Sequence, residues 1–233
     1  MKDLFGKAIL DYQTNNSPED IITETSISEA DEMSVSYLFR TFNEMPYLEQ
    51  KALKLAKGKV LDVGCGAGSH SLYLQNEKNL EVVSIDISEK AIEACHLRGL
   101  KEARVQNVLD LKNEKFDTII LLMNGTGIFG TLAETSKYLQ KLKSLLNPDG
   151  QILIDSSDII YMFDDDSDGG KWIPSNGYYG ELTFTISYKN EKEATFPWLY
   201  LDYNTLQNAA IANDLQCELV MEGEHYDYLA RLY

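Results

Sequence analysis

Short apolar runs rich in β-branched residues alternate with helical patterns through the middle of the chain. Four strands are predicted from the apolar runs, at residues 59–63, 81–85, 116–122 and 151–154. Three helices are predicted from apolar residues three and four positions apart, at 69–75, 88–98 and 131–146. Strands that alternate with helices indicate an α/β fold, in which helices cover both faces of a mostly parallel sheet.

The segment before this body has a different pattern. Within residues 1–57, Leu38, Phe39, Phe42 and Met45 recur at helical spacing after a polar stretch. We therefore expect a helical N-terminal segment that lies over the rest of the domain as a lid.

The remaining residues, 58–233, contain an insertion. Residues 159–202 are expected to form a loop and a β-hairpin, with strands at 182–188 and 195–202. A helix and two strands are predicted after it, at 204–213, 217–221 and 226–232.

Composition excludes several classes of protein. The chain has 233 residues, 44% of them hydrophobic, so it can bury a substantial core. Its net charge of -16 argues against nucleic acid and anionic membranes as partners, because both are bound through Lys and Arg. No apolar run approaches the roughly 20 residues of a membrane span, and the N-terminus does not resemble a signal peptide. The three cysteines are an odd number, so free thiols and a cytoplasmic location are expected.

A glycine-rich turn follows the first strand of the body. Gly64, Gly66 and Gly68 come directly after it and precede a helix, the arrangement with which α/β folds bind nucleotides at the carboxyl edge of a sheet. A dinucleotide-binding fingerprint would have its third glycine at position 69, which is Ser69 here. An acidic residue, Asp62, also stands two positions before the first glycine.

From about residue 58 to about residue 155 the chain resembles the class I S-adenosylmethionine-dependent methyltransferases, and Asp62 through Gly68 match their first motif. The resemblance implies a Rossmann-like sheet of seven mostly parallel strands with the last strand antiparallel. It further implies S-adenosylmethionine as cofactor and direct displacement of its methyl group onto an acceptor. We expect a small-molecule acceptor. The sequence specifies neither the identity of this acceptor nor the oligomeric state of the protein.

The resemblance also implies which residues contact the cofactor. The loop around the glycines would wrap the methionine part, and Asp86 would accept hydrogen bonds from the ribose hydroxyls. Asn107 and Val108 would contact the adenine. The carbonyls of Met123 and Asn124 would face the amino group and the sulfonium, and Tyr12 would lie across the cofactor. The full set is Tyr12, Asp62, Gly64, Cys65, Gly66, Gly68, Asp86, Ile87, Asn107, Val108, Met123 and Asn124.

Several of these assignments have alternatives. Asp86 could cap the following helix, a role that Ser88 would serve equally well. Asp110 competes with Asn107 for the adenine, and Tyr12 could belong to the core. Cys65 is not expected to be a nucleophile, because direct methyl transfer needs no cysteine.

Three residues are candidates for acid–base chemistry. His225 is the first, since its turn should lie at the cofactor edge and imidazoles titrate near neutral pH. Asp158 is the second and His70 the third, although His70 could instead pack against the cofactor or cap its helix. A histidine in a turn can also be merely a solvated polar residue.

No metal site is expected. Asp164, Asp166, Asp168 and Gly169 imitate the start of a calcium-binding loop, but the twelfth position is Ser175 in place of glutamate. An acidic surface loop is the preferred interpretation.

Two functions from other classes stay open on the sequence alone. One is an NAD(P)-dependent Rossmann oxidoreductase, against which Ser69 and Asp62 speak. The other is a non-catalytic protein that binds S-adenosylmethionine for regulation, because a fold does not dictate a function.

Overall fold

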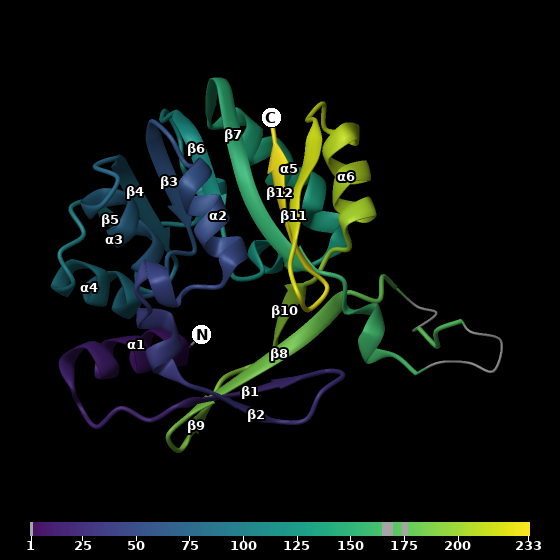
Figure 1. The fold of residues 1–233 in the computed structure, drawn as a ribbon. Coiled ribbons are helices and arrows are strands. Elements are labelled where there is room, and N and C mark those ends of the chain that lie inside the picture. The colour runs from purple at the N-terminus through teal and green to yellow at the C-terminus, as the bar shows by residue number, and fades with distance from the viewer. Residues whose placement is uncertain (1, 165–169, 174–176) are drawn as a thin grey trace.

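A seven-stranded sheet forms the centre of the computed structural model, which describes residues 2–164, 170–173 and 177–233 (Figure 1). Its strands are β3 (Lys59–Val63), β4 (Glu81–Asp86), β5 (Ala103–Val105), β6 (Phe116–Leu121), β7 (Leu146–Ser157), β11 (Cys217–Glu222) and β12 (Asp227–Leu232). Their order is β11-β12-β7-β6-β3-β4-β5. The five strands from β7 to β5 are parallel, whereas β12 is antiparallel to both of its neighbours. This is the predicted sheet, including its antiparallel last strand.

Alternate residues of the central strands pack against helices on opposite faces. Val60 and Ile120 lie with α2 (Tyr47–Leu55) and α3 (Ser69–Asn76) in one core. Leu61 and Ile119 lie with α5 (Thr135–Ser144) and α6 (Tyr203–Ala212) in the other. Side chains of successive strand residues point to opposite faces, so near-continuous apolar runs bury both faces of the sheet. The fourth helix, α4 (Glu89–Leu97), packs beside β4 and β5.

A second, antiparallel sheet lies below the carboxyl edge of the first (Figure 1). Its order is β10-β8-β1-β2, with β9 also paired to β8. The strands are β1 (Ile21–Thr25), β2 (Asp31–Met33), β8 (Glu181–Tyr188), β9 (Glu191–Lys192) and β10 (Phe196–Leu199). The predicted hairpin is therefore present as β8 and β10, and its turn region contains β9.

The N-terminal segment is only partly helical. It contains α1 (Leu4–Thr14), but the expectation of a helical lid missed the strands β1 and β2. β1 pairs with β8, so that Ile22 lies opposite Ser187. The second edge of β8 is thereby satisfied by a strand rather than by solvent. α1 covers this sheet and packs against α4.

The helix suggested by the spacing of Leu38, Phe39, Phe42 and Met45 was a wrong prediction. These residues belong to two 3-10 turns, η1 (Val35–Phe39) and η2 (Phe42–Glu44), and to the residue after them. Arg40 is extended between the turns, and a capping box of Thr41 and Glu44 starts the second one. Met45 is extended because Pro46 follows it.

Four further 3-10 turns connect the strands and helices: η3 (Val108–Asp110), η4 (Gly125–Phe129), η5 (Leu132–Glu134) and η6 (Ile159–Met162). The residues that imitate a calcium loop lie outside the described part of the chain, except Asp164. Within the described residues no helix is long and apolar enough to cross a bilayer.

Candidate functional site

The glycine loop between β3 and α3 has the backbone that the sequence predicts. Gly64, Gly66 and Gly68 all have positive φ, at 75°, 52° and 79°. The amides of Gly64 and Cys65 both donate to the carbonyl of Ile85 on β4, at 2.9 and 3.1 Å. A Cβ on Gly66 would meet nothing within 4 Å, so the side of the loop at Gly66 is open to a ligand.

Asp62 faces the protein interior. Its carboxylate is buried and accepts a hydrogen bond from the Ser71 hydroxyl at 2.6 Å, while Ser84 donates to Ser71 at 2.7 Å. Burial raises the pKa of Asp62, although His70 and Ser71 favour its charged form. Asp62 thus joins β3 to α3 behind the glycine loop and positions the loop through its backbone.

Asp86 ends β4 beside the same loop. One carboxylate oxygen accepts a hydrogen bond from the amide of Gly66, and the other accepts one from the amide of Ser88, both at 2.9 Å. The hydroxyl of Ser88 caps α4 by accepting the amide of Ala91 at 3.0 Å. Ser88 is therefore the cap that the sequence offered as an alternative, and Asp86 braces the glycine loop at the position expected for a ribose ligand.

The residues expected around the adenine and ribose lie along the same edge. Ile87 is 65% exposed and Asn107 is exposed, with its side-chain oxygen capping η3 through Leu109. Val108 buries its side chain in the main core, which leaves only its backbone for a ligand. Tyr12 is 38% exposed on α1 and packs on Phe39 with ring centroids 4.5 Å apart.

A strained loop follows β6. Met123 and Asn124 have φ of 67° and 60°, values that residues other than glycine seldom adopt. Asp155 near the end of β7 stabilises this backbone, because its carboxylate accepts the amides of Met123 at 3.0 Å and Gly125 at 2.8 Å. Burial raises the pKa of Asp155 to about 7, although the hydrogen bonds from these two amides act to lower it.

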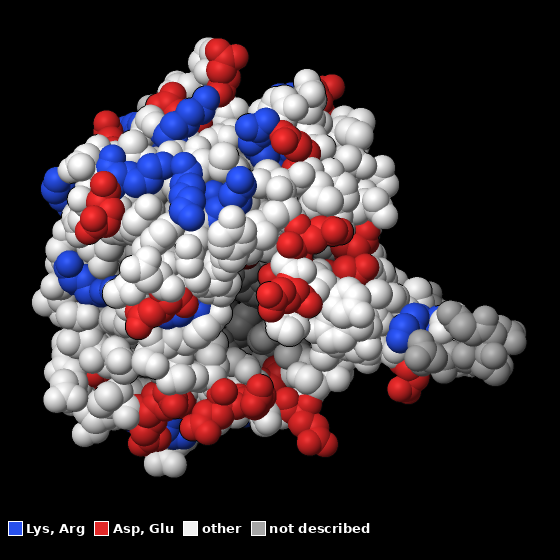
Figure 2. Space-filling view, viewed as in Figure 1, with Lys and Arg blue, Asp and Glu red and all other residues white. Residues whose placement is uncertain are grey.

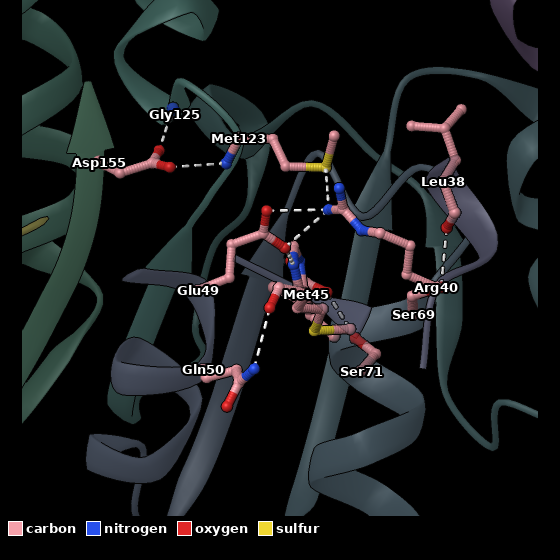
Figure 3. A network of polar contacts seen from close by, with 12 residues as sticks. Leu38, Arg40, Met45, Glu49, Gln50, Ser69, Ser71, Met123, Gly125 and Asp155 are labelled. Carbon is pink, nitrogen blue, oxygen red and sulfur yellow. Dashed lines mark hydrogen bonds and ion pairs between the residues drawn. The ribbon is translucent and has the colours of Figure 1, made fainter. Parts of the chain in front are cut away.

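A buried cluster of ionisable groups lies next to that loop (Figure 3). Both carboxylate oxygens of Glu49 on α2 accept hydrogen bonds from Nη2 of Arg40, at 2.8 and 2.9 Å. Oε2 of Glu49 also lies 2.7 Å from Nε2 of His70 on α3. Burial alone would lower the pKa of His70, but Glu49 and the more distant Asp62 and Asp155 raise it. The Glu49 carboxylate thus connects α2 to α3 and to Arg40, which lies between η1 and η2.

The three predicted acid–base residues do not converge. His225 lies exposed in the turn between β11 and β12, where its backbone amide donates to the Asp227 carboxylate at 3.0 Å. Asp158 is close to that turn, since its amide donates to the carbonyl of Tyr226 at 2.9 Å. Its carboxylate accepts the hydroxyl of Tyr179 at 2.7 Å. His70 lies apart in the buried cluster, and it does not cap its helix, whose N-cap is Gly68.

An aromatic wall faces this edge from the second sheet. Phe184 on β8 lies 6.2, 6.0 and 6.4 Å from the ring centroids of Phe196, Trp198 and Tyr200. The Trp198 indole packs directly on Gly127 of η4, where any Cβ would overlap it. Trp198 is half-buried, so it is neither fully core nor freely exposed. Figure 2 shows that the molecule is hollowed between the two sheets, with Asp and Glu side chains flanking the hollow.

Cys65 and Cys95 lie behind the glycine loop, with sulfurs 3.9 Å apart. Both are buried free thiols, and the contact with Cys95 together with burial raises the pKa of Cys65. A thiol in this state is a poor nucleophile.

Sequence reasoning missed Arg40, Glu49 and Asp155. Glu49 occupies a helix position that periodicity cannot distinguish from a solvated one, and Arg40 lies in a segment predicted as helix. Asp155 could have been noticed as a charged residue directly after the apolar residues 152–154 of β7.

Comparisons with known proteins identify the family of this chain. A family model described as a methyltransferase domain matches residues 54–197. An S-adenosylmethionine-dependent methyltransferase from Bacteroides fragilis, solved in complex with S-adenosyl-L-homocysteine, is 45% identical with a TM-score of 0.92, covering 100% of this chain and 94% of that one. A sugar N-methyltransferase from Streptoalloteichus, 14% identical with a TM-score of 0.58, covers 80% of this chain and 84% of its own and shares the fold.

Curated relatives match over shorter stretches. Ubiquinone biosynthesis O-methyltransferase from Xanthomonas euvesicatoria is 29% identical over 110 residues, 44% of each protein. A probable cobalt-precorrin-6B C(15)-methyltransferase from Saccharolobus solfataricus is 31% identical over 50% of this chain and 61% of that protein. The chain spans about half the length of the curated relatives it matches. The predicted family is confirmed and the oxidoreductase alternative is wrong: with its family model spanning more than half of the sequence, the chain belongs to the S-adenosylmethionine-dependent methyltransferases.

Proposed function

We propose that this protein binds S-adenosylmethionine along the carboxyl edge of the seven-stranded sheet and methylates a small molecule held in the hollow between the two sheets. The observation that carries the proposal is the meeting of three features at this edge: the open glycine loop, Asp86, and the strained Met123–Asn124 loop. The S-adenosyl-L-homocysteine bound by the Bacteroides fragilis relative supports the same cofactor here.

The residues at this edge suit that cofactor. Gly66 leaves open space beside the backbone, and Asp86 is the carboxylate available for the ribose hydroxyls. Met123 and Asn124 would present backbone carbonyls to the methionine end. When bound, S-adenosylmethionine supplies a methyl group on a positively charged sulfur. Asp155 fixes the Met123–Asn124 loop, and the aromatic wall would orient the acceptor and exclude water.

Half-buried rings indicate the class of acceptor. The half-buried rings of Phe184 and Trp198 lie 6.0 Å apart in the second sheet, and Figure 2 shows acidic side chains that flank the hollow between the two sheets. Such a surface suits a small molecule with a flat or apolar part and no strong negative charge. It does not suit nucleic acid, because acidic side chains repel the phosphates.

His225 and Asp158 are the groups we propose for accepting or orienting an acceptor proton. They lie close together at the carboxyl end of β7, joined through the amide of Asp158 and the carbonyl of Tyr226. His70 is reassigned to positioning, because Glu49 occupies its Nε2 inside the buried cluster. An amine acceptor need only be neutral in order to attack the methyl group, whereas a hydroxyl would need a base to remove its proton.

Calorimetry and turnover test the proposal. Wild type should bind S-adenosyl-L-homocysteine and not NAD, and Asp86→Ala should weaken that binding by about 2–4 kcal/mol through the loss of charge-assisted hydrogen bonds. Gly66→Val should abolish binding, since its side chain fills the open space beside the loop. Glu218→Ala on β11, which removes an exposed carboxylate, is the control and should bind like wild type.

Turnover then separates an enzyme from a regulatory protein. Methyl-labelled S-adenosylmethionine incubated with a small-molecule extract should yield labelled product and S-adenosyl-L-homocysteine. Tight binding without turnover across a broad set of extracts would favour the non-catalytic alternative. Once an acceptor is found, an unchanged rate and acidic limb in His225→Gln would remove His225 from the chemistry and leave Asp158 or solvent.

A further inference from the structure

Tyr200 directly follows β10, and its two neighbours fix it at the carboxyl edge of the seven-stranded sheet. The carbonyl of Leu199 accepts a hydrogen bond from Nδ2 of Asn124 at 3.3 Å. The amide of Leu201 donates to the hydroxyl of Ser156 at 2.9 Å. Asn124 belongs to the loop after β6 and Ser156 to the end of β7, so Tyr200 is held where these two segments meet.

The side chain of Tyr200 points away from the main core. The ladder between β10 and β8 continues to Tyr200, whose amide donates to the carbonyl of Gly180 at 2.8 Å. Leu199 and Leu201 are both fully buried in the main core, and successive residues of an extended chain point to opposite sides. Tyr200 is half-buried instead, and its ring stacks on Phe184 with centroids 6.4 Å apart. The ring therefore belongs to the aromatic wall of the second sheet.

The hydroxyl of Tyr200 is available to a ligand. Within residues 2–164, 170–173 and 177–233, no group forms a hydrogen bond with it. By contrast, the hydroxyls of Tyr178, Tyr179 and Tyr228 each donate to an oxygen of the protein. A tyrosine hydroxyl that is partly withdrawn from water usually finds a partner, so the Tyr200 hydroxyl has an unused hydrogen-bonding capacity.

The surroundings of Tyr200 keep this hydroxyl neutral. Burial raises the pKa of Tyr200 to about 12, and the nearby Tyr161 and Asp155 add to the rise. A neutral phenol is not a base, but it can accept and donate hydrogen bonds. Asp155 also accepts the amide of Met123, so the same carboxylate links the Tyr200 hydroxyl to the loop after β6.

We propose that the hydroxyl of Tyr200 accepts a hydrogen bond from the acceptor atom that becomes methylated, and that this atom is a nitrogen or an oxygen that carries hydrogen. The inference rests on the proposed function and adds a residue that contacts the acceptor. With its N–H or O–H group bound to Tyr200, the acceptor directs a lone pair at the methyl carbon. This lone pair forms the new bond, the carbon–sulfur bond breaks with its electrons on sulfur, and the proton of the acceptor leaves to Asp158 or to solvent.

The test uses Tyr200→Phe, which removes one oxygen and keeps the ring. Label transfer is measured with saturating methyl-labelled S-adenosylmethionine and a small-molecule extract as the source of acceptor. The rate of the variant should be roughly tenfold to a hundredfold below that of wild type. Its affinity for S-adenosyl-L-homocysteine, measured by calorimetry, should stay within about twofold of wild type, because the lost hydroxyl serves the acceptor.

A second measurement needs no turnover. With S-adenosyl-L-homocysteine bound, quenching of Trp198 fluorescence by the extract fraction that becomes labelled gives the affinity for the acceptor. Trp172→Phe provides the background, since it leaves Trp198 as the single tryptophan. Tyr200→Phe should weaken this affinity about fivefold to tenfold. Tyr138→Phe is the control: Tyr138 is also half-buried and stacks on Phe129 at 5.0 Å, and its loss should change neither measurement.

NMR of the labelled product locates the methyl group. A methyl group on nitrogen or oxygen would agree with the inference, and one on carbon or sulfur would overturn it. An unchanged rate in Tyr200→Phe would also overturn it, as would a lost affinity for S-adenosyl-L-homocysteine, since Tyr200 would then serve the cofactor or the fold. Each of these results leaves the proposed function standing, whereas absence of label transfer by wild type would overturn the proposed function itself.

Discussion

The carboxylate of Asp155 accepts the backbone amide of Met123 at 3.0 Å, so β7 fixes the first residue of the loop that follows β6. Its folded-state pKa of about 7 lies above the ordinary 3.8, which means that folding favours the protonated form. The contribution of this group to stability is therefore complete below about pH 4 and is lost as pH rises through 7.

Asp155→Asn should remove that pH dependence. Between about pH 5 and pH 8, the free energy of unfolding of wild type should fall by about 1–3 kcal/mol relative to the variant. The variant should also bind S-adenosyl-L-homocysteine less tightly, because an amide NH2 cannot accept a backbone N–H. Urea unfolding at both pH values gives the comparison, and parallel curves for the two proteins would contradict the assignment.

The pair of Glu49 and His70 predicts a second pH effect. The pKa of His70 is raised in the folded state, so its contribution to stability is present below the unfolded value of about 6.5 and is lost as pH rises through the folded value. His70→Gln keeps an N–H donor for Glu49 and loses the charge. We expect it to be less stable than wild type by about 1–2 kcal/mol at pH 5.5, with a smaller difference at pH 8.5. A constant difference would mean that His70 stays neutral.

Gly68 should tolerate no side chain. A Cβ there would lie 2.7 Å from Cδ1 of Leu100 and 3.0 Å from the sulfur of Cys95, both buried, and φ is 79°. Gly68→Ala should lower the free energy of unfolding by about 2–4 kcal/mol. Gly99 is the matched control, because its φ is 92° but a Cβ would meet nothing within 4 Å. Gly99→Ala should cost only about 1 kcal/mol, so equal losses in urea unfolding would refute the packing argument.

The N-terminal segment should behave as a lid attached through Asp11. This buried carboxylate accepts the Tyr188 hydroxyl at 3.0 Å and the Lys189 ammonium at 2.7 Å, which ties α1 to β8. Proteolysis within residues 1–30 of wild type should slow when S-adenosyl-L-homocysteine is added. Asp11→Asn should be cleaved several times faster. Glu24→Gln, whose exposed pair with Lys192 is a weak contact, should match wild type. Equal cleavage rates with and without ligand would argue for a permanently closed cover.

Local patterns predicted six strands of the seven-stranded sheet, and only the family resemblance implied the seventh, β5. β6 and residues 152–154 of β7 are apolar runs, and the glycine turn after β3 is encoded by three residues within five positions. β1 escaped prediction because only Ile21 among its residues is buried, and its pairing partner β8 lies far along the chain. A strand stabilised mainly by distant pairing has little local signal.

The glycine loop after β3 and the acidic residue at the end of β4 could be predicted for the same local reason, whereas the buried cluster could not. Arg40, Glu49 and His70 come from three elements, and only the packing of α2 and α3 on one face of the sheet brings them together. In sequence each is an ordinary polar residue. His225 and Asp158 were expected at the same edge as His70, but the width of the sheet separates β12 from β3, since β7 and β6 lie between them.

The pairing of β1 with β8 has a consequence for how the chain acquires its structure during synthesis. Residue Ile22 leaves the ribosome long before its partner Ser187, so the wall of the hollow cannot form until most of the polypeptide has been made. Until then β1 and β2 present open backbone edges, and closing so long a loop is slow compared with the local βαβ units. The five parallel strands from β3 to β7 can therefore pair first, and β11 and β12 complete the seven-stranded sheet last. In between, the open edges of β1 and β2 are exposed to strand-capturing chaperones or to aggregation.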